Sequence, residues 1–167
     1  MKKTYYIIIL ILMISCDLRN PNYSDEEIIK MKHDIIENGD DESYNEIYSN
    51  IGRKDSLLNI EMLPYSLKMM DVKNSESEYS FFEFFLRAKF KGKYNPNDLI
   101  KLAKPEQDLL IYYLEKGSEN DSDYCAGVIS EYYRHGVYYS KDIKKADSIY
   151  EAIYNGRTYP SKELRKL

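Results

Sequence analysis

The sequence has few residues of the kinds that most enzymes and metal sites use. It contains no tryptophan, two cysteines and two histidines among 167 residues, and His33 and His135 stand far apart in the chain. It also lacks a Gly-x-Ser-x-Gly motif, a phosphate-binding glycine-rich loop and a dinucleotide-binding fingerprint. These absences argue against a serine hydrolase and a nucleotide-dependent enzyme, and we predict a protein that is not an enzyme and that holds no cofactor.

Two patterns of possible metal ligands are incomplete. His33 and Glu37 share one face of a predicted helix, but a structural zinc site needs about four ligands and no others are near. Asp121 and Asp123 begin like a calcium loop, yet Ala126 stands where that loop requires glycine. We therefore predict no metal site.

Long apolar runs are also missing, except at the N-terminus. Lys2 and Lys3 precede an unbroken apolar stretch at positions 5–14, and Ser15-Cys16 follows. The stretch is too short for a membrane-spanning helix but fits the apolar region of a signal peptide. The end of this stretch resembles the lipobox of bacterial lipoproteins, in which the cysteine is acylated and becomes the new N-terminus. The alternatives are an ordinary secretory signal or an uncleaved anchor.

This resemblance divides the chain into a signal peptide at 1–15, a lipidated Cys16 with a tether at 16–23, a helical domain at 24–156 and a tail or cap at 157–167. It implies a protein anchored by lipid in the bacterial cell envelope. Cleavage would remove two of the 24 basic residues and leave 22 against 28 acidic ones. Such an acidic chain is a poor candidate for binding nucleic acid.

The first part of the mature chain reads as a pair of helices. Ser24 and Glu27 form a capping box, in which each side chain satisfies a backbone N–H of the other residue. Gly39 is expected to end this helix, because glycine tolerates the left-handed conformation. A second helix is predicted over residues 40–51, with Gly52 after it.

The middle of the chain contains an unusually aromatic segment. We predict that one helix begins at Pro64, and that a second capping box of Ser75 and Glu78 starts another that ends at Gly92. All five phenylalanines of the sequence lie in this second helix. A helix that is apolar on most sides is usually buried between neighbours. The alternative is an aromatic surface exposed for a partner.

The last third predicts three more helices. One runs from Lys104 to Gly117, the next ends at Gly136, and the last begins with Ser140 as its cap and ends at Gly156. Apolar residues at spacings of three and four place one stripe on each of the last two helices. The first stripe is Cys125, Val128, Ile129, Tyr132 and Tyr133, and the second is Ile143, Ala146, Ile149, Tyr150, Ile153 and Tyr154. We interpret Cys125 as a core residue and not as a nucleophile.

Part of this region resembles a Sel1-like repeat, a relative of the tetratricopeptide repeat. The positions with the family's spacing are Tyr133, Gly136, Asp142, Lys145, Ala146 and Tyr150. The chain departs from the family pattern where Tyr138-Tyr139 replaces a usual Gly-Val pair and Ile153-Tyr154 replaces a pair of alanines. The resemblance implies structural roles for the six matching residues, and a scaffold that binds other proteins without chemistry of its own.

The whole mature chain is therefore predicted to be all-α, with about eight helices stacked as antiparallel hairpins in a short solenoid. Each hairpin has an apolar face that it cannot cover alone, so stacking joins these faces into one core. No segment shows the alternation of a β-strand.

Tyrosine is the residue in excess, with 18 copies. Tyr138 and Tyr139 fall in the predicted turn between the last two helices, where we expect exposure to solvent. Tyrosine gives a large contact area with little loss of rotamer freedom, so we predict these two residues as candidate contacts for an unidentified protein partner.

Two functional hypotheses follow. The first is a lipid-anchored scaffold that binds another protein, one version being an immunity protein that neutralises a toxin, since acidity complements basic toxin surfaces. The second is an envelope hydrolase that uses a pair of carboxylates, whose members could be distant in the sequence.

Overall fold

The computed structural model describes residues 23–52, 58–74 and 76–155. Every regular element in this part of the chain is helical, which confirms the predicted all-α class. The elements are α2 (Asp25–Asn38), α3 (Asp41–Glu46), the π-helix η1 (Ile47–Gly52), α4 (Leu58–Asp71), α5 (Ser77–Lys89), the 3-10 helix η2 (Pro96–Lys101), α6 (Lys104–Glu119), α7 (Asp123–His135) and α8 (Ile143–Tyr154).

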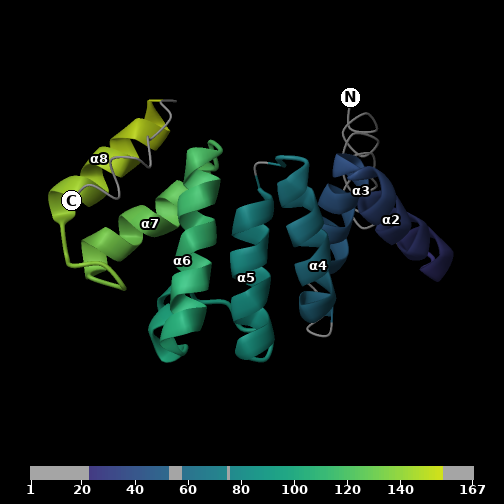
Figure 1. Cartoon of the computed structure of the whole chain (residues 1–167), viewed down its shortest axis with the longest axis horizontal. Coiled ribbons are helices and arrows are strands. Elements are labelled where there is room, and N and C mark those ends of the chain that lie inside the picture. Colours follow the sequence, from purple (N-terminus) through teal and green to yellow (C-terminus); the bar gives the residue numbers. More distant parts are fainter. Residues whose placement is uncertain (1–22, 53–57, 75, 156–167) are drawn as a thin grey trace, which may run out of the picture.

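The helices follow one another in space in the order in which they occur in the sequence. Figure 1 shows a row that begins with α2 at one end and finishes with α8 at the other. Consecutive helices pack as adjacent pairs, most extensively α4 with α5 and α7 with α8. Contacts also skip one helix: the rings of Tyr48 and Phe84 join η1 to α5 with centroids 5.5 Å apart, and those of Tyr79 and Tyr124 join α5 to α7 at 5.1 Å.

Several predicted helix ends are confirmed. The Ser24 backbone N–H donates to the Glu27 carboxylate at 2.7 Å, and the Glu27 N–H donates to the Ser24 hydroxyl at 3.3 Å, so the capping box is complete. Gly39 and Gly136 end α2 and α7 with φ of 64° and 73°, where glycine avoids the Cβ clash of other residues.

Pro64 lies inside α4 and does not begin it, which corrects the prediction. A proline within a helix removes one backbone hydrogen bond and crowds the carbonyl of the residue four positions earlier. Here both Pro64 and Ile60 are exposed. Water can therefore reach the carbonyl that loses its partner, and the helix continues through the proline.

Three other predicted boundaries differ. Helix α8 is capped by Asp142 and not by Ser140, because the Asp142 carboxylate accepts the Lys145 N–H at 2.9 Å. Helix α6 continues past Gly117 to Glu119. Ser75 lies outside the described residues, and the N-cap of α5 is Glu76, which makes no side-chain capping bond.

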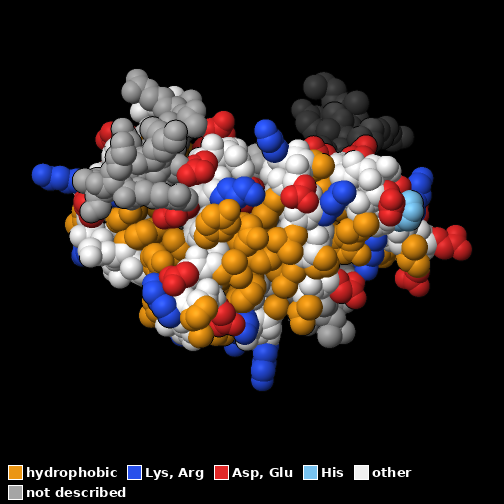
Figure 2. All heavy atoms as spheres, in the orientation of Figure 1, with side chains coloured by type: hydrophobic (Ala, Val, Ile, Leu, Met, Phe, Trp, Pro, Cys, Tyr) orange, Lys and Arg blue, Asp and Glu red, His pale blue; other side chains and the backbone are white. Residues whose placement is uncertain are grey.

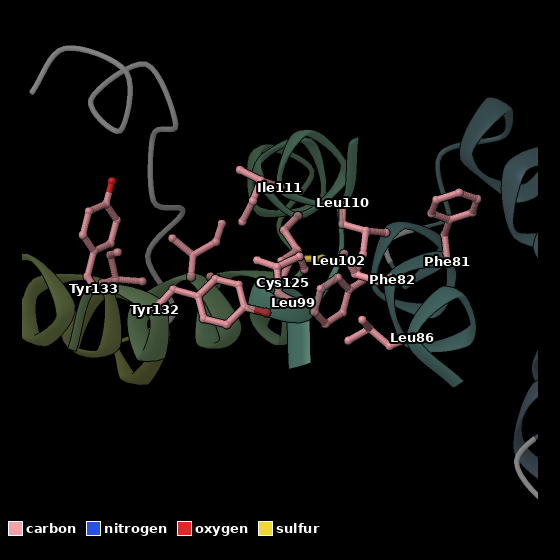
Figure 3. Close-up of a cluster of buried hydrophobic side chains, with 14 of the residues drawn as sticks. Phe81, Phe82, Leu86, Leu99, Leu102, Leu110, Ile111, Cys125, Tyr132 and Tyr133 are labelled. Atoms are coloured by element: carbon pink, nitrogen blue, oxygen red, sulfur yellow. The ribbon is translucent and has the colours of Figure 1, made fainter. Parts of the chain in front are cut away.

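Helix α5 is buried between its neighbours, as its aromatic composition predicts. Phe82 and Leu86 pack with side chains of η2, α6 and α7, and Figure 3 shows Phe82, Leu110 and Cys125 converging there. Phe84 points into a second, smaller core with Ile35 and residues of α3, η1 and α4. One helix therefore supplies side chains to both cores.

Buried carboxylates of α5 accept hydrogen bonds from within the helix and from other elements. Glu83 is 2% exposed and accepts from Arg87 Nε and from the Tyr48 hydroxyl, both at 2.9 Å. Glu78 is fully buried and accepts from the Asn120 side chain at 2.8 Å. A buried carboxylate must be paired or hydrogen-bonded, so these bonds fix η1 and the end of α6 against α5.

Two helical glycines provide a matched test of this packing. A Cβ at Gly117 would meet Cys125 Sγ and lie 2.9 Å from Glu78 Cβ, whereas a Cβ at Gly127 would meet nothing within 4 Å. We expect Gly117→Ala to lower the free energy of unfolding by about 1–3 kcal/mol through overpacking. Gly127→Ala should raise it by about 0.5–1 kcal/mol through better helix propensity. Urea denaturation measures both, and equal effects of the two changes would contradict the close approach of α5, α6 and α7.

Candidate functional site

The turn between α7 and α8 carries the two tyrosines predicted as partner contacts. Gly136 begins the turn, and the Asp142 N–H donates to the carbonyl of Tyr133 at 2.8 Å, which closes it. Between them Tyr138 has φ of 64°, in the left-handed region. Residues other than glycine and asparagine seldom adopt this conformation, so contacts of the side chain must offset the strain.

Tyr138 makes these contacts with α6. Its hydroxyl donates to Asp108 at 2.6 Å, and Lys104 Nζ lies 4.0 Å above the centre of its ring. Lys104 also pairs with Asp108 at 2.8 Å. Hydrogen bonds from Lys104 and then from Tyr138 lower the pKa of the Asp108 carboxyl. The three side chains therefore form one cluster that ties the turn to the first turns of α6.

Tyr139, like Tyr138, is half-buried, which corrects the expectation that both lie free in solvent. Its ring stacks on that of Tyr133, with centroids 4.3 Å apart and planes 12° apart. Its hydroxyl donates to Glu115 on α6 at 3.0 Å. Burial, followed by the charge of Glu115, raises the pKa of Tyr139. Tyr133 has a second contact, because Lys145 Nζ lies 4.4 Å from the centre of the Tyr133 ring.

The residues that match the repeat pattern fall into two groups. Tyr133, Lys145 and Ala146 are buried, Gly136 ends α7, and Asp142 caps α8. Tyr150 differs, because it is 59% exposed, and Ile143 and Tyr154 of the same predicted stripe are also exposed. The apolar stripe predicted for α8 therefore lies on two sides of the helix. Of its members, Ala146 and Ile149 pack inward and Ile153 does so in part.

Aromatic side chains form a second candidate surface, on α5 and α6. We call Phe85, Leu109, Tyr112 and Tyr113 the α5–α6 face. Beneath it Phe81 contacts Phe85 and Tyr113, with ring centroids 6.1 and 4.7 Å apart.

Two members of the α5–α6 face are open to solvent. Tyr112 is 49% exposed and its ring lies 5.3 Å from that of Tyr113. Leu109 is 42% exposed. The α5–α6 face could have been identified from the sequence by the width of the apolar stripe on α6, because this stripe is wider than one neighbouring helix can cover.

Hydrophobic side chains are not confined to α5 and α6. Figure 2 shows them gathered across the middle of the displayed side, over α4, α5 and α6. At the edge of the α5–α6 face, Lys89 Nζ lies 5.7 Å from the ring centre of Phe85 and pairs with Glu106. A contiguous apolar surface with a charged border is typical of a site of protein interaction.

The end of the row that α2 and α3 form, away from the α7–α8 turn, is strongly acidic. Residues 23–46, which include α2 and α3, contain nine acidic and two basic residues. Tyr23 donates its hydroxyl to Glu46 at 2.6 Å, and this bond raises the pKa of Tyr23 to about 12.

The two histidines each contact one acidic residue. His33 contacts Asp34 at 3.7 Å, and His135 contacts Glu131 at 3.1 Å. Within the described ranges, no three histidine, cysteine or acidic side chains group as metal ligands would.

The two cysteines differ in what the structure says of them. Cys125 is fully buried in the core, as predicted, and burial raises the pKa of its thiol, which suits a packing residue and not a nucleophile. Cys16 and the predicted signal peptide lie outside the described residues. In the part that is described, no helix has both the length and the apolar character needed to cross a bilayer.

Comparisons with known proteins do not assign the chain to a family. No family model, no curated protein and no solved structure matches it.

The left-handed backbone conformation of Tyr138 leads to a testable prediction about stability. Alanine and glycine both remove the ring, but only glycine adopts φ of 64° without a penalty of about 1–2 kcal/mol. We expect Tyr138→Gly to be more stable than Tyr138→Ala by about 1 kcal/mol in urea denaturation. At Tyr112, inside α6, the order should reverse by a similar amount, because glycine is the poorer helix former. Alanine above glycine at both positions would refute the left-handed turn.

Proposed function

We propose that this protein is a lipid-anchored, non-catalytic scaffold of the bacterial cell envelope that binds another protein. The observation that carries the proposal is the α5–α6 face, where aromatic and aliphatic side chains stay in solvent although a buried core lies directly beneath them. Tyrosine and phenylalanine dominate binding energy at protein interfaces, and the rigid helices below hold them in place before a partner arrives.

A solenoid of Sel1-like hairpins is the architecture that we propose for the scaffold. Contacts that skip one helix, from η1 to α5 and from α5 to α7, are what successive hairpins in such an array would make. Tyr138 adds support, since it takes the left-handed conformation at the position where the family pattern has glycine. The cluster with Lys104 and Asp108 explains how a tyrosine is tolerated there.

An immunity protein is one version of this function. The acidic end formed by α2 and α3 would attract a basic toxin and speed its association at low salt. A toxin gene beside the gene for this protein, and protection of cells that express both, would support this version. The hydrolase alternative receives less support, because Glu78 and Glu83 are each committed to hydrogen bonds that hold helices together.

Lipidation at Cys16 has a direct test. A diacylated or triacylated cysteine anchors a protein stably, whereas one acyl chain is marginal. We expect Cys16→Ser to release the protein from membrane fractions and to abolish labelling by a fatty-acid probe. Cys125→Ser is the control, because that thiol is buried, and it should leave both results unchanged. Labelling and fractionation that survive Cys16→Ser would refute the anchor.

The proposed contact surface can be tested by photo-crosslinking in living cells. A photoreactive phenylalanine analogue at Tyr112 should give a covalent adduct of defined mass with the partner, and Leu109→Glu should remove that adduct by placing a charge in the apolar contact. The same analogue at Ile100, which is 61% exposed on η2 and lies outside the acidic end, is the matched control. Identical adducts from both positions, or an adduct that persists with Leu109→Glu, would contradict the α5–α6 face as the binding surface.

A further inference from the structure

The last helix in the row has an apolar face that no described residue covers. Ile143, Tyr150 and Tyr154 of α8 are 50%, 59% and 85% exposed. Their spacings of seven and four residues place them in one line along the helix. The other side of α8 packs on α7 through Ala146 and Ile149, which are fully buried. This line is separate from the α5–α6 face, since α8 lies at the end of the row and α7 lies between it and α6 in the chain (Figure 1).

Charged residues run beside this line in a pattern that fits a copy of itself. Lys144 and Glu151 are both exposed and stand seven residues apart on the same side of α8. Neither forms an ion pair with any residue of 23–52, 58–74 or 76–155. They are too far apart along one helix to pair with each other, because seven residues span about 10 Å.

We propose that α8 pairs with α8 of a second copy of this chain, antiparallel and about a two-fold axis between Asp147 and Ser148. In this register Ile143 of each copy lies between Tyr150 and Tyr154 of the other, which is how side chains interdigitate in packed helices. Residues on one side of a helix face residues on the same side of its symmetry mate.

The charges agree with this register. Lys144 of each copy faces Glu151 of the other, so the contact contains two ion pairs. In a parallel two-fold arrangement, Lys144 and Glu151 of the two copies would lie on opposite sides of the contact and could not pair. The two Asp147 side chains approach each other near the axis, but each is already paired with Arg134 of its own chain at 2.8 Å, which reduces their repulsion.

Charge exchange across this contact provides the decisive experiment. We expect the full-length protein in detergent to sediment as a dimer at equilibrium, with a dissociation constant that rises with salt. Lys144→Glu and Glu151→Lys alone should each weaken the dimer by roughly five- to thirtyfold. The double variant Lys144→Glu/Glu151→Lys restores opposite charges only between two chains, so its dissociation constant should return to within about threefold of the wild type.

Two further variants keep the test independent of folding. Ile143→Glu should give a monomer with unchanged helical content by circular dichroism, because the side chain is already half exposed. Asp147→Cys, beside the proposed axis and on the side of α8 that carries the exposed line, should form a disulfide-linked dimer in membranes, whereas cysteine at Ser148, which points away from that line, should not. The buried Cys125 does not compete in this reaction.

Several results would overturn the proposal. A wild-type protein that is monomeric at every concentration would do so, and so would a double charge variant as weak as either single one. If the chain becomes dimeric only after residues 157–167 are deleted, then that segment, and not a second copy, is the occupant of the face.

Discussion

Helix α5 imposes the main constraint on this fold, because it cannot hide its aromatic side chains against one neighbour alone. Phe84 faces the core of α2, α3, η1 and α4, while Phe82 and Leu86 face that of α6 and α7. Each such side chain contributes roughly 1.5–3 kcal/mol on burial, so removing the helices on either side would leave α5 in water with an apolar surface. The two cores therefore depend on each other through this one helix.

Buried acids make the position of α5 specific. Apolar contacts tolerate small shifts along a helix, but the Glu83 carboxylate must remain within reach of Tyr48, and Glu78 within reach of Asn120. Removing one partner of a buried charge costs about 3–5 kcal/mol, because the other group is left buried without compensation. These bonds fix the register of η1 and α6 on α5, and hence the position of Tyr112 and Leu109 above the core.

Local signals in the sequence predicted those features that local chemistry decides. Gly39, Gly136 and the Ser24–Glu27 box end and begin helices for reasons contained within a few residues, and the structure agrees. Prediction was wrong where tertiary contacts decide. Pro64 is tolerated inside a helix because its side faces water, and Tyr139 is half-buried because it contacts Glu115 and Tyr133. A sequence pattern does not contain the distance between a turn and the helix beside it, so exposure of the turn could not be predicted.

The helices at the two ends of the row each expose one side to solvent, but the side chains on these two sides differ. A row of packed helices leaves one uncovered side at each end, and polar side chains keep such a side compatible with water. At the α2 end, Ile29 and Ile36 are exposed but lie in a segment with nine acidic residues, so charge surrounds them. The α8 end has no comparable excess of charge, and its exposed line contains two tyrosines and an isoleucine. An apolar end face without such charge stays in water only at a cost of about 25 cal/mol per Å², and covering it with an identical face removes this cost for both chains at once.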